Sequence, residues 1–196
     1  MLDVSVTCAP GEMLAVTGPS GSGKSTLLAL LAGLDQPDGG RVEIAGTRMS
    51  HLGRAAAARL RARHIGVLTQ ASGLLTHLSV LDNVRLAAQL RRGSGPSARE
   101  LLDGLGLGAV VHSMPRTLSG GETTRAGLAV ALAGSPTVLL ADEPTAEVSA
   151  TEENAVLDLL ARWRPARGAT VVVTHSVEVA RTADRRIELC DGRLVA

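Results

Sequence analysis

The fold of this 196-residue chain is decided by the stretch Gly18-Pro19-Ser20-Gly21-Ser22-Gly23-Lys24-Ser25-Thr26. Residues 13–17 before it predict a strand, and residues 24–32 predict the helix that it enters. In that context glycines let backbone N–H groups turn inward around phosphate oxygens, and the helix N-terminus adds its positive dipole end. The pattern predicts that the whole loop binds nucleotide phosphates, that Lys24 reaches the β- and γ-phosphates, and that Ser25 ligands Mg²⁺. The alternative is a glycine-rich turn with a surface lysine, but residue types, spacing and context agree against it.

A second functional element is the acid pair Asp142-Glu143, which follows the apolar run 138–141. A nucleotide-hydrolysing site needs a carboxylate near the metal and a base that orients the attacking water. We therefore expect Asp142 to serve Mg²⁺ from its outer coordination sphere and Glu143 to be the catalytic base. By itself, an acid pair at a strand end fits a solvated turn equally well. The phosphate loop favours the functional interpretation.

Short β-branched runs alternate with longer helical patterns, which predicts parallel strands joined by helices. The expected fold class is α/β: a P-loop NTPase core with a mostly parallel sheet, a small helical subdomain and a short antiparallel β portion. Residues 138–141 and 170–174 are apolar on consecutive positions, as in central strands covered on both faces. Other expected elements are strands at 41–44 and 65–69, helices at 54–63 and 152–163, a helical stretch at 78–108 interrupted at 93–96, and a closing hairpin at 187–190 and 193–195.

Apolar spacing predicts which helix faces are buried. The expected inward residues are Val80, Val84, Leu86 and Leu90 in the helical stretch, and Val156, Leu159, Leu160 and Trp163 in the helix at 152–163. Trp163 is therefore interpreted as a core residue and not as a ligand contact. The helix at 54–63 carries four arginines, which we interpret as a solvated face in preference to a binding patch.

Composition excludes several classes of protein. Twenty Lys and Arg residues against nineteen Asp and Glu give a net charge of +1, so no global electrostatic argument favours nucleic acid as a partner. No stretch approaches the roughly 18 to 20 apolar residues of a membrane span, and no secretory signal is expected at the N-terminus. The expected compartment is the cytoplasm. Cys8 and Cys190 lack a Cys/His cluster, which indicates buried, reduced thiols.

The segment Leu118-Ser-Gly-Gly-Glu122 resembles the signature sequence of ABC-type ATPases. The resemblance extends over nearly the whole chain. Gln70 corresponds to the family's Q-loop glutamine, Glu143-Pro-Thr145 continues the acidic strand as in the family, and His175 corresponds to the switch histidine. The other histidines match no such position and are expected to be surface or packing residues.

The resemblance implies two nucleotide-binding domains paired head to tail, as a homodimer, with ATP between the phosphate loop of one and the signature of the other. Ser119, Gly120 and Gly121 would then offer a hydroxyl and backbone N–H groups to the γ-phosphate of ATP bound by the partner. It also implies that His175 contacts the γ-phosphate and that Gln70 senses Mg²⁺. The chain is expected to be one ATPase domain, with a RecA-like core at 1–75 and 126–196 and a helical subdomain at 76–125.

Three features depart from the family pattern. Similar domains begin with an extra strand whose aromatic residue stacks on adenine, whereas this chain starts at what resembles the following strand and has no Phe or Tyr. Loss of one such contact forfeits about 1 to 3 kcal/mol. Either the start lies further upstream or adenine is held weakly. Thr69 occupies a position that is usually aromatic, and Ser149 stands where an aspartate of the D-loop is expected, which predicts slower hydrolysis.

The leading functional hypothesis is the ATP-hydrolysing subunit of a transporter whose membrane permease is a separate chain, placed peripherally on the inner face of the membrane. Residues 54–70 and 74–84 resemble the small subunits that serve lipoprotein release, macrolide or peptide export and FtsX-like permeases. The alternatives are a soluble ABC ATPase acting on DNA or ribosomes, and a weakly hydrolysing regulatory paralogue.

Overall fold

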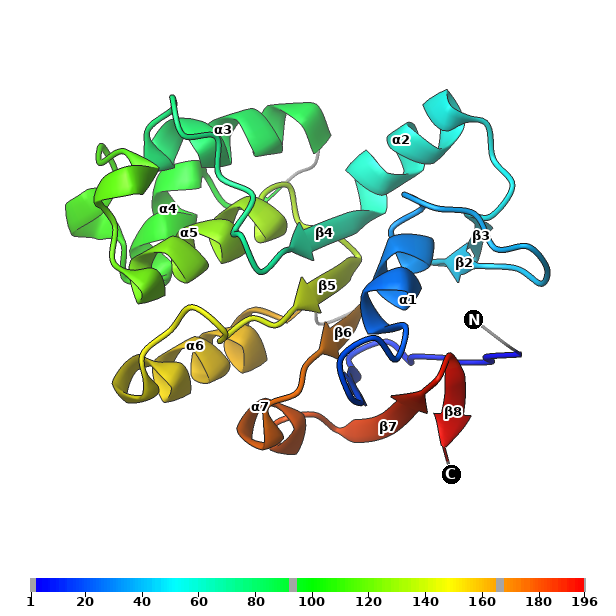
Figure 1. Cartoon of the computed structure of the whole chain (residues 1–196). Helices are drawn as coiled ribbons and strands as arrows, with labels where there is room; N and C mark the ends of the chain where they lie inside the picture. Colours follow the sequence, from blue (N-terminus) through cyan, green and yellow to red (C-terminus); the bar gives the residue numbers. More distant parts are fainter. Residues whose placement is uncertain (1–2, 92–94, 165–167, 196) are drawn as a thin grey trace.

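Strands and helices alternate along most of the chain in the computed structural model, which describes residues 3–91, 95–164 and 168–195 (Figure 1). The elements in chain order are β1 (Met13–Thr17), α1 (Lys24–Leu31), β2 (Glu43–Ile44), β3 (Thr47–Arg48), α2 (Arg54–His64), β4 (Ile65–Leu68), α3 (Val80–Arg91), α4 (Ala98–Gly104), η1 (Gly108–Val110), η2 (Pro115–Thr117), α5 (Gly120–Leu132), β5 (Val138–Asp142), α6 (Ala150–Trp163), β6 (Ala169–Val173), α7 (Val177–Arg181), β7 (Arg185–Cys190) and β8 (Arg193–Val195).

The main sheet has the strand order β4-β5-β6-β1-β7-β8. Every neighbouring pair is parallel except β7 and β8, which form the antiparallel closing hairpin. Its turn, Asp191-Gly192, has positive φ at both residues, as a two-residue hairpin turn of type I′ requires. A separate antiparallel pair joins β2 and β3. The predicted mostly parallel sheet with a short antiparallel portion is confirmed.

Apolar side chains cover both faces of the main sheet. On one face, Leu139 of β5 and Val172 of β6 belong to a cluster with side chains of α3 to α7. On the other face, Leu140 and Val171 belong to a cluster with side chains of α1, α2 and β2. Alternate residues of each strand therefore enter opposite clusters, as the two-residue period of a strand requires. The prediction of doubly covered central strands is confirmed.

Helices α3, α4 and α5 contact one another beside the edge strand β4 (Figure 1). Arg91, the last residue of α3, donates from its guanidinium to the carbonyl of Ala131 in the last turn of α5. Burial lowers the pKa of Arg91 to about 10, so the side chain stays charged at neutral pH. Its positive charge therefore interacts favourably with the negative, C-terminal end of the α5 dipole. The ring of Trp163 packs against Gly104 of α4, since a Cβ added to Gly104 would lie 2.5 Å from Cζ2 of Trp163. Trp163 is thus a packing residue, as predicted.

Three sequence expectations need correction. Leu90 is 67% exposed, because at 100° per residue it lies about 120° round the helix from buried Val84. Leu157 is buried on α6 although it was not among the predicted inward residues. The strand expected at 41–44 is only two residues long, since the amide of Val42 donates to the Ser50 hydroxyl and not to a strand partner. The predicted interruption at 93–96 falls partly outside the described residues.

Candidate functional site

The carboxyl ends of four adjacent parallel strands bring most of the predicted site residues, but not the signature segment, to one edge of the sheet. Gln70 follows β4, the Asp142-Glu143 pair ends β5, His175 follows β6, and the phosphate loop follows β1. Leu68 is level with Ala141, and Asp142 is level with Val173, so these loops begin at the same height. Ligands of open α/β sheets bind outside the carboxyl ends of the strands. Gln70 is exposed at this edge.

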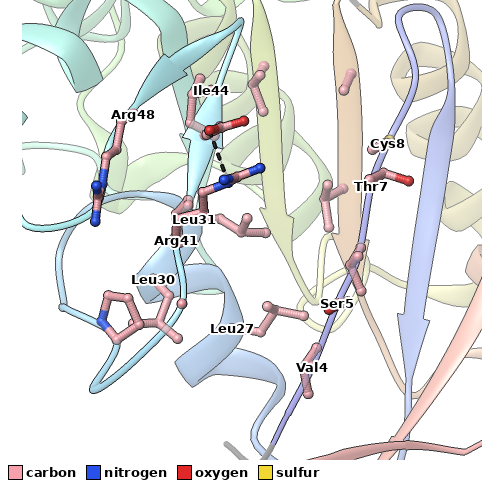
Figure 2. A pocket seen from close by; sticks show the side chains of 18 of the residues that line it. Val4, Ser5, Thr7, Cys8, Leu27, Leu30, Leu31, Arg41, Ile44 and Arg48 are labelled. Atoms are coloured by element: carbon pink, nitrogen blue, oxygen red, sulfur yellow. Dashed lines mark ion pairs between the residues drawn. The ribbon is translucent and has the colours of Figure 1, made fainter.

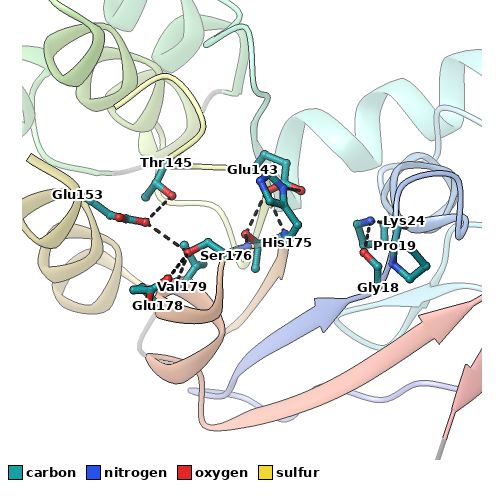
Figure 3. Close-up of polar contacts among 11 residues, drawn as sticks. Gly18, Pro19, Lys24, Glu143, Thr145, Glu153, His175, Ser176, Glu178 and Val179 are labelled. Atoms are coloured by element: carbon teal, nitrogen blue, oxygen red, sulfur yellow. Dashed lines mark hydrogen bonds and ion pairs between the residues drawn. The ribbon is translucent and has the colours of Figure 1, made fainter. Parts of the chain in front are cut away.

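The phosphate loop has the backbone shape that its glycines predict. Gly18 has φ 147°, and a Cβ there would lie 2.0 Å from the carbonyl oxygen of Leu189 in β7. Gly23 is the N-cap of α1 with φ 103°, a left-handed conformation that favours glycine. The ammonium group of Lys24 donates to the carbonyls of Gly18 at 2.8 Å and Pro19 at 2.9 Å (Figure 3). The lysine therefore lies over the loop that would hold the phosphates.

The hairpin after β7 supports this loop from behind. The amide of Gly192 donates to the carbonyl of Ser22 at 2.9 Å. Ser22 is buried, and its hydroxyl has no hydrogen-bond partner among the described residues. The sequence predicts both the hairpin and the loop, but no local signal indicates that they touch.

Asp142 and Ser25 provide the oxygen atoms expected around Mg²⁺. Burial raises the pKa of the Asp142 carboxyl, and the charge of Glu143 adds to this, whereas the hydrogen bond from Ser25 and the charge of Lys24 act in the opposite direction. A hydroxyl beside a carboxylate suits Mg²⁺, which is commonly held by one or two protein oxygens together with substrate phosphates. Within the described ranges no cluster of three His, Cys, Asp or Glu side chains could hold a metal alone. The residues present fit a metal that arrives with nucleotide.

Glu143 and His175 form a hydrogen-bonded pair (Figure 3). Nδ1 of His175 lies 2.8 Å from Oε1 of Glu143, while the amide of His175 donates to Oε2 at 3.2 Å. The carboxylate is 16% exposed and the imidazole 74% exposed. Glu143 also has φ 47°, an uncommon conformation for a residue other than glycine that clusters at functional sites. The predicted base and the predicted switch residue are therefore in contact.

The signature segment begins α5. Ser119 is the N-cap: its hydroxyl accepts from the amide of Glu122, whose carboxylate accepts from the amide of Ser119. A Cβ on Gly120 would lie 2.1 Å from the carbonyl oxygen of Glu147. A Cβ on Gly121 would lie 2.5 Å from Oε1 of Glu152. Gly120 thus permits close contact with the loop between β5 and α6, and Gly121 permits close contact with the first turn of α6.

Ser119, Gly120 and Gly121 lie on a different side of the molecule from the phosphate loop of the same chain. In Figure 1, α5 and α1 lie on opposite sides of β5. Ser119 and Gly120 are exposed, and the N-terminus of a thirteen-residue helix is suited to an anion. A phosphate held there would come from outside this chain's own loop.

Ser149 is the N-cap of α6. Its hydroxyl contacts Oγ1 of Thr151 at 3.0 Å and donates to Oε2 of Glu152 at 3.1 Å. Oε1 of Glu152 in turn lies 3.9 Å from a guanidinium nitrogen of Arg125 on α5. A neutral hydroxyl thus stands at the predicted D-loop position, with a carboxylate three residues later.

A cavity of about 1570 Å³ lies between the segment 3–8, α1 and the β2–β3 pair (Figure 2). Its apolar lining includes Val4, Leu27 and Ile44, and the Arg41–Glu43 ion pair lies at its side. Of the predicted site residues only Thr26 lines it. The cavity is therefore distinct from the edge of the sheet where the phosphate loop, Glu143 and His175 meet.

Comparisons with known proteins identify the family. The family model described as ABC transporter matches residues 1–146. The chain belongs to the ABC transporter family.

Relatives in the ABC transporter family match nearly the whole chain. It is 43% identical over 199 residues to the lipoprotein-releasing system ATP-binding protein LolD of Anaeromyxobacter dehalogenans, covering 98% of this chain and 83% of that protein. It is 42% identical over 189 residues to the uncharacterised ABC transporter ATP-binding protein YbbA of Escherichia coli K12, covering 94% and 83%. A dimeric post-hydrolysis state of the ATP-binding cassette MJ0796 with ADP and Pi superposes with a TM-score of 0.90 at 33% identity, covering 99% of this chain and 88% of that one.

This ABC transporter ATP-binding chain has the mostly parallel sheet that its sequence predicts. In the part of the chain that the structure describes, no helix has both the length and the apolar character needed to span a bilayer. Sequence reasoning named Thr145 only as part of the acidic segment and missed Glu153 and Ser176, which interact with one another and with Thr145 close to Glu143 and His175. No spacing rule joins these positions, because they lie in the loop after β5, in α6 and in the loop after β6.

Proposed function

We propose that this chain binds ATP with Mg²⁺ and hydrolyses it, and that it does so as one half of a head-to-tail dimer that powers a separate membrane permease. The observation that carries the proposal is the separation of two predicted phosphate-binding segments: the loop before α1 and the N-terminus of α5 lie on different sides of one chain. Two copies related by a two-fold axis would bring them together twice.

In the proposed site, different residues bind the phosphates, serve the metal and activate the attacking water. The backbone of Gly18 to Thr26 and the ammonium group of Lys24 would hold the phosphates, while Ser25, Asp142 and Gln70 would serve the metal. Bound Mg²⁺ would supply positive charge to the β- and γ-phosphates. Glu143 orients and deprotonates the attacking water, and His175 holds Glu143 and reaches the γ-phosphate.

We further propose that the chain acts at the inner face of a membrane on a permease of the lipoprotein-release or export type. The identity to LolD supports the type, since that protein's name assigns it to a lipoprotein-releasing system. The MJ0796 cassette, described as dimeric, supports the pairing. We propose one ATPase domain over 1–196, with 76–125 as its helical part, and expect α5 to connect the two parts because it runs across position 125.

Calorimetry with Mg-ATP, followed by size-exclusion chromatography with light scattering, tests the proposal. Glu143→Gln keeps the shape of the base and removes its basicity, so this variant should bind ATP and accumulate as a dimer without hydrolysing it. The wild type should hydrolyse ATP, and hydrolysis should return the dimer to monomer. Absence of ATP binding, or an ATP-bound Glu143→Gln protein that stays monomeric, would overturn the proposal. Binding without any turnover by the wild type would favour the regulatory alternative that Ser149 suggests.

A further inference from the structure

Glu153, in the first turn of α6, bridges the two loops that carry Glu143 and His175 (Figure 3). Its Oε1 accepts a hydrogen bond from the hydroxyl of Thr145 at 3.0 Å and one from the hydroxyl of Ser176 at 3.3 Å. Thr145 lies two residues after Glu143, and Ser176 lies one residue after His175. A single carboxylate oxygen thus connects the loop after β5 with the loop after β6.

The Ser176 end of this bridge continues to the predicted base through two further hydrogen bonds. The amide of Ser176 donates to Oγ1 of Thr174 at 2.9 Å. The hydroxyl of Thr174 donates to Oε2 of Glu143 at 3.0 Å. Thr174 is fully buried, so its hydroxyl has no solvent to replace that acceptor. A shift of Ser176 would therefore be transmitted to the Glu143 carboxylate.

The Thr145 end of the bridge is also buried. Losing the Glu153 acceptor would leave the Thr145 hydroxyl without a hydrogen-bond partner among the described residues, and an unsatisfied buried donor is costly enough to move a loop. Ser176 has a second acceptor, Oε2 of exposed Glu178 at 3.3 Å, but its single hydroxyl hydrogen serves one carboxylate at a time. Within the described part of the chain, the Glu153 carboxylate is the acceptor that Ser176 and Thr145 share.

We propose that Glu153 is a positioning residue for ATP hydrolysis, which holds the loops after β5 and β6 in register so that Glu143 and His175 face the attacking water together. The inference rests on the proposed function of Glu143 and His175. A competing explanation is that Glu153 only stabilises the N-terminus of α6 through its negative charge.

Three variants on α6 separate these explanations by steady-state kinetics. Glu153→Ala removes the acceptor and should lower kcat about tenfold with KM changed less than about twofold, because positioning matters in the chemical step. Glu153→Gln removes the charge but keeps an amide oxygen that both hydroxyls can reach, so it should keep more than about half of the wild-type kcat. Asp158→Ala removes an exposed acid of the same helix and should behave as the wild type. Equal losses in Glu153→Gln and Glu153→Ala, or wild-type kcat in Glu153→Ala, would overturn the proposal.

Amide hydrogen exchange gives a readout that does not depend on hydrolysis. In Glu153→Ala the amides of His175 and Ser176, which donate to Glu143 and Thr174, should exchange at least about threefold faster than in the wild type and in Asp158→Ala. Unchanged exchange at both amides would overturn the inference even if the wild type hydrolyses ATP.

If the wild type lacks ATPase activity, the proposed function fails, while the exchange result still decides whether Glu153 holds these loops. If Glu153→Ala does not fold, Thr145→Val replaces it, because this variant removes one hydroxyl donor at nearly constant volume. It is expected to accelerate exchange at the amides of Ala146 and Val148, which donate to the carbonyls of Glu143 and Thr145.

Discussion

At the scale of single residues, the backbone around the site leaves no room for a side chain at two glycines. The missing Cβ of Gly18 faces the carbonyl of Leu189, and that of Gly120 faces the carbonyl of Glu147. Neither carbonyl is the end of a flexible side chain, so a substitution must move backbone. The sequence pattern identifies both glycines, but only the packing explains why a side chain at position 120 would displace the backbone around Glu147.

Gly120→Ala should separate the signature segment from the loop between β5 and α6. We expect a loss of stability of about 1 to 3 kcal/mol, as for overpacking of a well-filled site. ATP-induced dimerisation of a Glu143→Gln background should weaken by at least about tenfold because the phosphate-binding N–H groups shift. Gly39→Ala, where a Cβ meets nothing within 4 Å, is the control. Equal behaviour of the two variants in thermal unfolding and light scattering would contradict this prediction.

Cys8 should be an unreactive thiol. Burial, followed by the negative charge of Glu12, raises its pKa to about 11. The thiolate is the reactive form, so at pH 8 only about 0.1% of the thiol is reactive, and each further pH unit up to about 10 should speed alkylation roughly tenfold. Mass spectrometry of a Cys190→Ser variant treated with iodoacetamide measures the rate. A rate that already levels off near pH 9 would show that the folded chain does not protect Cys8.

At the scale of elements, two helices begin with the same capping box. Ser97 and Glu100 cap α4, and Ser119 and Glu122 cap α5. The same local chemistry thus serves one helix with no predicted ligand and one that carries the signature segment. The sequence motif is identical in kind, so only the position of the helix distinguishes a purely structural cap from a functional one.

Ser97→Ala and Ser119→Ala form a matched pair. Each should lower the free energy of unfolding by about 1 kcal/mol through loss of the cap. Only Ser119→Ala should also reduce ATP-driven dimerisation and hydrolysis, because its hydroxyl is proposed to meet the partner's γ-phosphate. Chemical denaturation and an ATPase assay measure the two effects. A similar loss of ATPase activity in both variants would mean that the Ser119 effect is one of stability alone.

At the scale of the whole molecule, the proposed site is shared between two copies, so defects in different halves should complement each other. Lys24→Ala damages the phosphate loop and Gly120→Ala the signature segment. A mixed dimer contains one site with both lesions and one intact site. When equal amounts of the two variants are mixed, random pairing makes about half of the dimers mixed. Each mixed dimer has one intact site of two, so ATPase activity should recover to about a quarter of the wild-type level. If the mixture is no more active than the two variants measured separately, each site is built within one chain.

The sequence by itself determined the α/β class, the phosphate loop, the acid pair and most of the helices and strands. These features depend on local rules: glycine spacing, apolar periodicity and caps act over a few neighbouring residues. The motif order also determined the family through a resemblance that the comparisons confirm. The role of each site residue remains a prediction, for the phosphate loop and the acid pair as well as for Gln70, His175 and the signature residues.

Only the tertiary structure decided which distant residues touch. The strand order β4-β5-β6-β1 brings Gln70, Glu143, His175 and Gly18 to one edge, although their order along the chain is different. The hairpin amide of Gly192 supports the phosphate loop, and Glu153 joins Thr145 to Ser176. Leu90 likewise points to solvent because α3 packs through its other face. Such contacts follow from strand pairing and helix packing between segments far apart in sequence, and no short-range pattern encodes them.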